Sequence, residues 1–416
     1  MPHTKILALI MAGGAGSRME VLTKVRAKPA LPYAGVYRLI DFPLSHCVHS
    51  AISDVWIVEQ FQPQSLNDHL VNGRPWDLDR TYGGLRVLPP FTGTPESGWH
   101  QGNADAIFRN KRFIREFAPD LLVVLSADHI YKLDYRQVID AHLSHHADVT
   151  LVTTQVPLDQ ASRFGTVQVN AQGKVTQFAY KPEQPQSTTV TTEVFVYNAP
   201  KLLDTLDELV ARKRGASDDE NATLKDFGHE LLPLLVETGH AFAFPLDGYW
   251  RDVGTIDSYW ASHMDLLADE PPLNLDEPNW PILTFGSQRL PARIAASARI
   301  EDSLIAPGCQ IRGHVAHSVL GPGVIVEQGA VVRNAIVFHD TIIAAGATVD
   351  HAIVDSQVRI GARAQVGARA VQADHVDRND DRPEIAVVGQ RVHLPEGARV
   401  ASGERVQPVA LADETD

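Results

Sequence analysis

The chain has 416 residues and a formal net charge of −14 at neutral pH. A chain of this length usually divides into two domains, because a single hydrophobic core stops growing at roughly 250–300 residues. The acidic balance argues against a protein that binds nucleic acid or a membrane surface, since both attract an excess of basic residues. Small-molecule chemistry fits the composition better.

The two cysteines, Cys47 and Cys309, have no spacing typical of a metal cage. Two isolated cysteines exclude a disulfide framework and indicate a reducing compartment. No apolar stretch approaches the roughly 20 residues that span a bilayer. The run from Ile6 to Ala12 is too short, and too soon followed by Arg18, to indicate a signal peptide. We therefore expect a cytoplasmic protein with no membrane partner.

The chain begins with a short apolar run that stops in the turn Gly13-Gly-Ala-Gly-Ser-Arg18. The run predicts a buried strand, and the glycines lack the Cβ atoms that would keep a backbone from phosphate oxygens. Arg18 adds a planar, charged donor suited to phosphate. The spacing matches neither the P-loop nor the dinucleotide fingerprint, so an ordinary strand-to-helix turn is the alternative. The candidates for binding a triphosphate are Gly13, Gly14, Gly16 and Arg18.

Apolar runs alternate with helix-like segments as far as Leu267, which predicts a Rossmann-like, mostly parallel sheet covered on both faces. Ligands of such sheets lie beyond the carboxyl ends of the strands. The expected strands are Ile6–Met11, Asp54–Glu59, Leu121–Ser126, Val149–Thr154 and Val194–Tyr197, and the expected helices include Asp105–Phe117 and Tyr135–His145.

Five prolines between residues 270 and 291 predict a linker, and the sequence period changes after it. Aliphatic residues then recur at six-residue steps, as in Ile294 to Ile300 and Ile343 to Val349, interleaved with Pro-Gly and Gly-Ala pairs. This step is typical of a left-handed parallel β-helix, whose ends and flat faces commonly mediate oligomers. A structural module is favoured over an acyltransferase site, since no histidine is set apart as catalytic. The expected division is a catalytic domain over 1–268, a linker over 269–292 and a β-helix with a polar tail over 293–416. Within the last part, we expect residues 374–382 to form a charged loop and the acidic end of the chain to be disordered.

Two carboxylates are candidate metal ligands. Asp128 follows the strand Leu121–Ser126 at the sheet edge that carries the glycine turn, where it can hold Mg²⁺ against triphosphate oxygens. Asp252 is the second candidate, and two carboxylates on one cation suit attack at a phosphorus centre. The alternatives are that Asp128 caps a turn and that Asp252 pairs with Arg251.

Two lysines, Lys28 and Lys181, each precede a proline, which stiffens the chain beside the charge. Holding a lysine still costs side-chain entropy and suggests a fixed anion, although a solvated surface lysine is the alternative.

Several motifs in chain order resemble one family. With the glycine turn they are Arg26-Ala-Lys-Pro-Ala, Ala127-Asp-His-Ile-Tyr-Lys, Lys181-Pro, Asp226-Phe-Gly and Tyr249-Trp-Arg-Asp-Val-Gly-Thr. The chain resembles ADP-glucose pyrophosphorylases (glucose-1-phosphate adenylyltransferases) over nearly its whole length. The resemblance implies a GT-A-like nucleotidyltransferase domain before the β-helix. It also implies a Mg²⁺-dependent reaction of ATP with α-glucose 1-phosphate, giving ADP-glucose and pyrophosphate for glycogen or α-glucan synthesis, in a homo-oligomer that we expect to be a tetramer.

The resemblance also implies roles for individual residues. Arg18 and Lys28 would bind the triphosphate and act with Asp128 in catalysis, while Asp128 and Asp252 would hold the metal. The adenine side would be formed by Gly102, Ala104 and Asp105, and the sugar-phosphate side by His100, Gly165, Tyr180, Lys181 and Thr191.

The sugar side departs from the family pattern at three places. His100 stands where the family usually has tyrosine, Tyr180 replaces the glutamate before Lys-Pro, and Thr191-Thr192-Glu193 replaces Ser-Met-Gly. Losing an acceptor for a sugar hydroxyl can cost up to about 10⁴-fold in discrimination. Two alternatives therefore stay open, a different sugar 1-phosphate or nucleotide and a regulatory subunit with little turnover.

Overall fold

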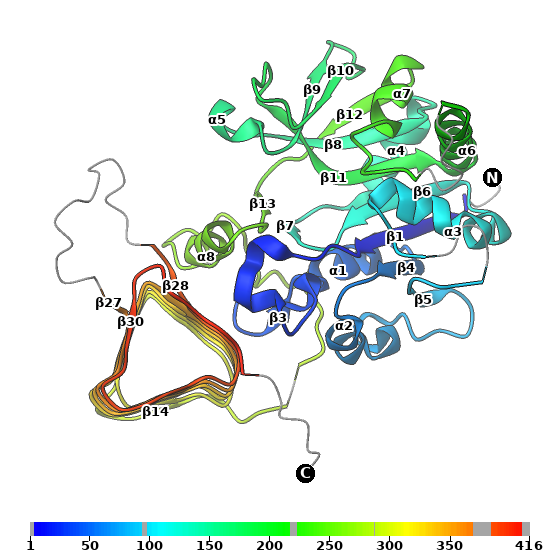
Figure 1. Ribbon diagram of the computed structural model, residues 1–416. Coiled ribbons are helices and arrows are strands. Elements are labelled where there is room, and N and C mark those ends of the chain that lie inside the picture. The colour runs from blue at the N-terminus through cyan, green and yellow to red at the C-terminus, as the bar shows by residue number, and fades with distance from the viewer. Residues whose placement is uncertain (1–3, 94–97, 217–222, 287, 369–383, 410–416) are drawn as a thin grey trace.

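The computed structural model describes residues 4–93, 98–216, 223–286, 288–368 and 384–409. These residues form a sheet domain with helices on both faces and, beside it, a triangular coil of short strands (Figure 1). The charged loop expected over 374–382 and the acidic end of the chain lie outside the described residues.

The central sheet has nine strands among the described residues. Along the main path the strands are β10 (Val175–Tyr180), β9 (Gly165–Val169), β11 (Thr189–Asn198), β6 (Leu121–Ser126), β1 (Ile6–Ala12), β4 (Asp54–Glu59) and β5 (Gly84–Leu88), while β8 (Val149–Gln155) pairs with β11 and β12 (Ala241–Pro245) with β8. Strands β6, β1, β4 and β5 are parallel, and β11 runs antiparallel to β6 and β8. Strand β8 therefore runs in the same direction as β6, and β12 is parallel to β8. Most strands thus share one direction, which confirms the expected mostly parallel sheet.

Helices cover both faces of the sheet. They are η1 (Ser17–Thr23), η2 (Lys28–Ala30), α1 (Asp41–His49), α2 (Pro63–Leu70), η3 (Val71–Trp76), α3 (Asn103–Phe117), α4 (Tyr135–Ser144), α5 (Leu158–Ala161), α6 (Ala199–Ala216), α7 (Leu231–Glu237) and α8 (Ile256–Asp265). Alternate residues of β1 enter different cores: Leu7 packs with α3, α6 and α7, and Ala8 packs with α1, α2 and α4. Alternation of this kind follows from the two-residue period of a strand.

The five strands and two helices expected from the sequence are all present, and β4 and β6 match residue for residue. Strand β11 is longer than expected because its first half, Thr-Val-Thr-Thr-Glu, is polar and gives no apolar run. No described helix is long and apolar enough to cross a membrane.

The coil consists of three six-stranded parallel sheets, one for each side of the triangle. In sheet order its strands are β14 (Arg293–Ile294), β17 (Gln310–Ile311), β20 (Ile325–Val326), β23 (Ile342–Ile343), β26 (Arg359–Ile360) and β29 (His393–Leu394), then β15 (Arg299–Glu301), β18 (His314–Ala316), β21 (Val331–Arg333), β24 (Thr348–Asp350), β27 (Gln365–Ala368) and β30 (Arg399–Ala401), then β16 (Leu304–Ile305), β19 (Val319–Leu320), β22 (Ile336–Val337), β25 (Ala352–Val354), β28 (Ala386–Val388) and β31 (Arg405–Val406). Buried aliphatic residues such as Ile311 and Ile343 fill its interior. The arrangement confirms the parallel β-helix that the six-residue step predicts.

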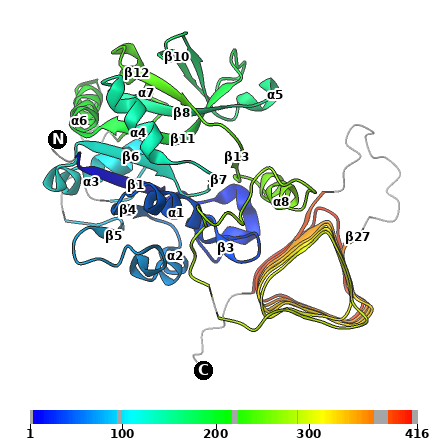
Figure 2. The same ribbon diagram turned by 180° about the vertical axis from the view of Figure 1, so that it is seen from behind.

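The coil packs against the sheet domain through η1 and α8, whose buried residues share a cluster with those of the coil. The short ribbon of β2 (Pro32–Tyr33) and β3 (Tyr37–Arg38) lies between the two bodies in both views (Figures 1 and 2). Buried Phe42 and Phe338 share one apolar cluster across the junction. Within it, Arg26 donates two hydrogen bonds, of 2.7 and 2.8 Å, to the carboxylate of Asp355, which is fully buried.

Loss of this buried pair should destabilise the whole protein. We expect Asp355→Ala to lower the free energy of unfolding by about 3–5 kcal/mol, because it leaves the Arg26 guanidinium buried without its partner. The exposed pair of Arg363 and Glu396 provides a matched control, and Arg363→Ala should cost less than about 1 kcal/mol. Urea unfolding followed by circular dichroism measures both, and equal losses in the two variants would contradict the assignment.

Candidate active site

The glycine turn follows β1 at the carboxyl edge of the sheet. Gly16 has a φ of 64°, and a Cβ there would come within 3.1 Å of Lys28 and Thr23, so the fold itself requires this glycine. A Cβ at Gly14 would meet nothing within 4 Å, and one at Gly13 would make only ordinary contact with Gln60. Because packing does not require glycine at these two positions, their bare backbone leaves room for a ligand.

Asp128 lies two residues beyond the end of β6. Ser126 donates a hydrogen bond of 2.5 Å to one carboxylate oxygen, and the ammonium of Lys28 pairs with the other. Burial raises the pKa of Asp128, but the charge of Lys28, helped by His129, outweighs burial and holds the pKa well below its usual range. Asp128 is therefore an anion, and its partner Lys28 lies next to Gly16 of the glycine turn.

Asp252 reaches the same place from a distant part of the chain. Strands β7 (His129–Tyr131) and β13 (Trp250–Asp252) pair antiparallel, with Asp252 opposite His129. The His129 Nε2 atom is 3.8 Å from a carboxylate oxygen of Asp128 and 3.7 Å from one of Asp252. The two carboxylates expected from the sequence thus meet across one imidazole ring.

The alternative pairing of Asp252 with Arg251 is wrong. Arg251 instead pairs with Asp265 at 2.7 Å. A Cβ at Gly254 would fall 2.8 Å from a carboxylate oxygen of Asp252 and 3.0 Å from an Arg18 guanidinium nitrogen, so Arg18 and Asp252 lie side by side.

His129 is held by a hydrogen bond from its Nδ1–H to the carbonyl oxygen of Thr192, at 2.9 Å. Burial lowers the pKa of His129, but the carboxylates of Asp128, Glu193 and Asp252 outweigh burial and raise it. The carboxylates thus favour the charged form of His129, and that form reduces the repulsion between Asp128 and Asp252.

A pocket lies beside this centre, and four of the five residues expected on the sugar-phosphate side line it. They are Gly165, Tyr180, Lys181 and Thr191, joined by Asn103, Glu193 and Asp226. The Tyr180 hydroxyl donates to Asp226 at 3.0 Å, and the Lys181 ammonium lies 4.8 Å from the centre of the Tyr180 ring. Lys181 has a φ of 45°, a rare backbone conformation that recurs at functional sites.

His100 does not line this pocket. Its backbone N–H donates to the Gln60 side chain at 2.6 Å, and Gln60 donates back to the His100 carbonyl at 3.2 Å. Since Gln60 packs beside Gly13, His100 belongs to the side of the glycine turn. Both of its ring nitrogens are buried without a hydrogen bond in the described part of the chain, and burial lowers the pKa of the ring.

The three residues expected on the adenine side stand at the start of α3. Asp105 is buried and accepts from the Gln101 N–H at 2.9 Å and from Arg109 at 2.6 Å, so it shapes the preceding loop. Ala104 donates its N–H to the Lys225 carbonyl at 3.1 Å. A Cβ at Gly102 would lie only 2.4 Å from the Lys225 carbonyl carbon. These residues hold the helix start against the loop that contains Asp226.

Sequence reasoning assigned no role to His129, Ser126 or Asp226, although His129 and Asp226 lie in the quoted motifs. The partners of His129 and Asp226, Thr192 and Tyr180, are far away in the chain, so local spacing could not reveal them. Ser126 is only two residues from its partner Asp128, but a serine at the end of a strand has no distinctive spacing.

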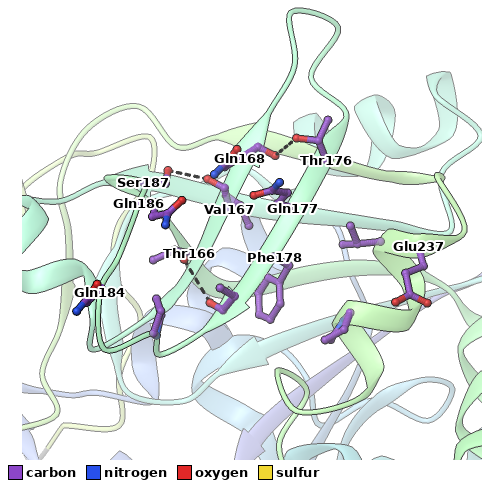
Figure 3. A pocket seen from close by; sticks show the side chains of 14 residues that line it. Thr166, Val167, Gln168, Thr176, Gln177, Phe178, Gln184, Gln186, Ser187 and Glu237 are labelled. Carbon is purple, nitrogen blue, oxygen red and sulfur yellow. Dashed lines mark hydrogen bonds between the residues drawn. The ribbon is translucent and has the colours of Figure 1, made fainter.

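A second groove lies on the other side of Phe178 and contains none of the expected site residues. It runs along β9 and β10 beside α7, where Gln168, Gln177 and Gln186 extend from its walls (Figure 3).

Asp128 and Asp252 fit a cation that a ligand helps to hold. Among the described residues no group of three or more histidine, cysteine, aspartate or glutamate side chains forms a complete metal cage. Mg²⁺ is commonly bound by only one or two carboxylates together with substrate phosphates and water. The two carboxylates, next to a turn open to phosphate, match that donor set.

The two glycines Gly102 and Gly14 should respond differently to the same change. We expect Gly102→Ala to cost about 1–3 kcal/mol of unfolding free energy, because its Cβ collides with backbone. Gly14→Ala, with open space around its Cβ, should leave stability unchanged within about 1 kcal/mol. Thermal and urea unfolding of the purified variants measures this difference, and a stable Gly102→Ala would show that the loop at residue 225 is free to move.

Comparison with known proteins agrees with this geometry. Residues 7–269 match a family model described as nucleotidyl transferase, and residues 290–388 match one described as GlmU-like, C-terminal hexapeptide. The chain is 36% identical, over all of its length and 96% of the relative's, to a glucose-1-phosphate adenylyltransferase of Acetivibrio thermocellus. It is 42% identical, over 86% of its length and 93% of theirs, to proteins of the same name from Bacillus mycoides and Bacillus cereus. Nucleotidyltransferases of this kind generally use a divalent metal. The chain therefore belongs to the glucose-1-phosphate adenylyltransferase family of nucleotidyl transferases.

Proposed function

We propose that this enzyme transfers AMP from ATP to α-D-glucose 1-phosphate, giving ADP-glucose and pyrophosphate for glycogen or α-glucan synthesis. The observation that supports this most directly is the meeting of Asp128 and Asp252 at His129, beside Lys28 and Arg18. The name of the relatives gives glucose 1-phosphate as one substrate and adenylyl as the group transferred.

In the proposed reaction a phosphate oxygen of the sugar phosphate attacks the α-phosphorus of ATP. The bond between that phosphorus and the oxygen bridging to the β-phosphorus breaks, and its electron pair leaves with pyrophosphate. The sugar phosphate is already an anion, so no side-chain nucleophile is needed. Positioning and charge neutralisation supply most of the catalysis in such transfers.

Arg18 and Lys28 neutralise the triphosphate in this proposal, with the bare backbone at Gly13, Gly14 and Gly16 allowing the phosphates to approach. Asp128 and Asp252 would hold Mg²⁺, which when bound supplies a Lewis acid for the phosphate oxygens. Lys28 pairs with Asp128 in the structure, and a phosphate oxygen can take over its ammonium as the nucleotide binds. The start of α3, from Gly102 to Asp105, would flank the adenine.

Lys181 takes the phosphate of the sugar in this proposal. Lys181 lines the pocket together with Gly165, Tyr180 and Thr191, and its ammonium lies 4.8 Å from the centre of the Tyr180 ring. The sugar would occupy the rest of that pocket.

A second candidate is the same transfer to a different sugar 1-phosphate. It is favoured by Tyr180, which stands where the family usually has a glutamate and whose hydroxyl is engaged with Asp226. Pyrophosphate release from a panel of sugar 1-phosphates and nucleotides separates the two candidates.

The role of Asp128 can be tested with one variant. We expect Asp128→Asn to lower kcat/KM for pyrophosphate release by at least about 10³-fold, since it removes a charged metal ligand. Removing Mg²⁺ with EDTA should abolish turnover of the parent enzyme. Asp140→Asn, at an exposed position of α4, is the matched control and should keep full activity. An Asp128→Asn enzyme that folds and works normally would exclude Asp128 from catalysis.

We also propose that the protein forms a homotetramer through the β-helix and the catalytic domains. Each chain would consist of domains over 1–268 and 293–416 joined by a linker over 269–292. The proposed location is a reducing cytoplasmic compartment. Ile294, Ile300 and Leu304 are between 37 and 49% exposed on the first coil of the β-helix, where a second copy can cover them. Cys47 and Cys309 are free and buried.

Light scattering on the purified protein should give a mass near four times 45.6 kDa. Charged substitutions at Ile294 and Leu304 should reduce that mass, because they place charges in the covered surface. A monomeric parent would rule out the assembly.

A further inference from the structure

Glu193 has an unusual backbone conformation in an otherwise regular strand. The pairing of β11 with β8 is regular up to Thr191 and resumes at Phe195, so the register shifts around Glu193. The residue has a φ of 55°, in the left-handed region that favours glycine. A glutamate retained in such a conformation marks a place where the surrounding structure enforces strain for a purpose.

The neighbour Thr192 fixes this bulge from both sides. Its hydroxyl donates to the Val152 carbonyl on β8 at 3.0 Å, and its own carbonyl accepts from His129 at 2.9 Å. The second bond ties the bulge to the ring that lies between Asp128 and Asp252. The backbone next to Glu193 is therefore joined to the reacting centre.

Glu193 provides an open acceptor in the pocket beside that centre. Glu193 lines the pocket with Lys181, Tyr180 and Asp226. The charges of His129 and Lys181 act on its carboxylate, but among the described residues no hydrogen bond or ion pair engages it. Asp226, by contrast, accepts from Tyr180 with one oxygen and from the Asn103 N–H with the other. A sugar in this pocket would thus meet the Asp226 carboxylate, whose two oxygens already accept hydrogen bonds, and the Glu193 carboxylate, which accepts none from the described residues.

We propose that Glu193 is a specificity-determining residue that accepts hydrogen bonds from hydroxyl groups of the sugar 1-phosphate. The inference rests on the proposed function, because it assumes that the sugar occupies this pocket. A carboxylate can accept from two neighbouring hydroxyls, and such charge-assisted bonds are about twice as strong as neutral ones. Glu193 thereby supplies a carboxylate acceptor in a pocket where Tyr180 stands in place of the family's usual glutamate.

The test compares Glu193→Ala and Glu193→Gln with the full-length parent. The substrates are glucose 1-phosphate and its 2-, 3-, 4- and 6-deoxy analogues, and the measurement is pyrophosphate release. Glu193→Ala should raise the KM for glucose 1-phosphate about 10- to 100-fold, with the KM for ATP changed less than about twofold. Glu193→Gln keeps one acceptor oxygen and should show a smaller rise.

The deoxy analogues identify the bond itself. The parent should discriminate against the analogue that lacks the hydroxyl bound by Glu193, and Glu193→Ala should lose that discrimination. Glu183→Gln, at an exposed site in the loop after Lys181, is the matched control and should behave as the parent.

Each result supports or overturns the inference. A Glu193→Ala enzyme with the parent's KM and the parent's discrimination overturns it while leaving the proposed function intact. A variant whose Mg²⁺ requirement changes instead of its sugar KM also overturns it, since Glu193 would then act on the metal. A parent that turns over none of the sugar 1-phosphates refutes the proposed function, and the inference falls with it.

Discussion

The contact of His129 with Asp128 and Asp252 is the constraint on which the candidate site depends. Two carboxylates near one point repel each other, and burial makes that repulsion stronger. The imidazole between them, the Lys28 ammonium on Asp128 and the Arg18 guanidinium beside Asp252 oppose this repulsion. These five groups come from three distant segments of the chain. The fold of the whole domain is therefore needed to assemble the site.

The parts of the fold that the sequence predicts well are those whose residues are buried on both faces. Strand β6 is fully buried and reads as an uninterrupted apolar run, so both of its ends could be predicted. Strand β11 is polar in its first half, where Thr191 and Glu193 line the pocket beside Lys181, so the apolar pattern indicates only its second half. The six-residue step of the coil was recognisable for a similar reason, since each turn buries an aliphatic residue in the same interior.

Side-chain partners were harder to predict than elements. Asp252 follows Arg251 directly, yet neighbouring residues in a strand point to opposite faces, so the two side chains do not readily pair with each other. Glycines raise a similar difficulty. Gly102 is needed because the backbone at Lys225 approaches it, whereas Gly14 has open space around it. The sequence alone does not distinguish a glycine that packing requires from one that it does not. The family resemblance placed His100 beside the sugar, but the Gln60 side chain holds its backbone on the side of the glycine turn.

The two halves of the site differ in how firmly the fold fixes them. The phosphate side stands at the ends of β1 and β6, in the middle of the parallel strands, where a shift would disturb the core on both faces. The sugar side is built on β9, β10 and β11, where β10 is an edge strand and the pairing of β11 is already irregular. Because β10 lies at the edge, a substitution there displaces fewer neighbours, and Tyr180 can turn to Asp226. Strand β11 lies inside the sheet, but its pairing with β8 is already interrupted around Glu193. Two of the three departures from the family pattern, at Tyr180 and at Thr191-Thr192-Glu193, lie on these strands, whereas the third, His100, lies beside Gln60 and the glycine turn.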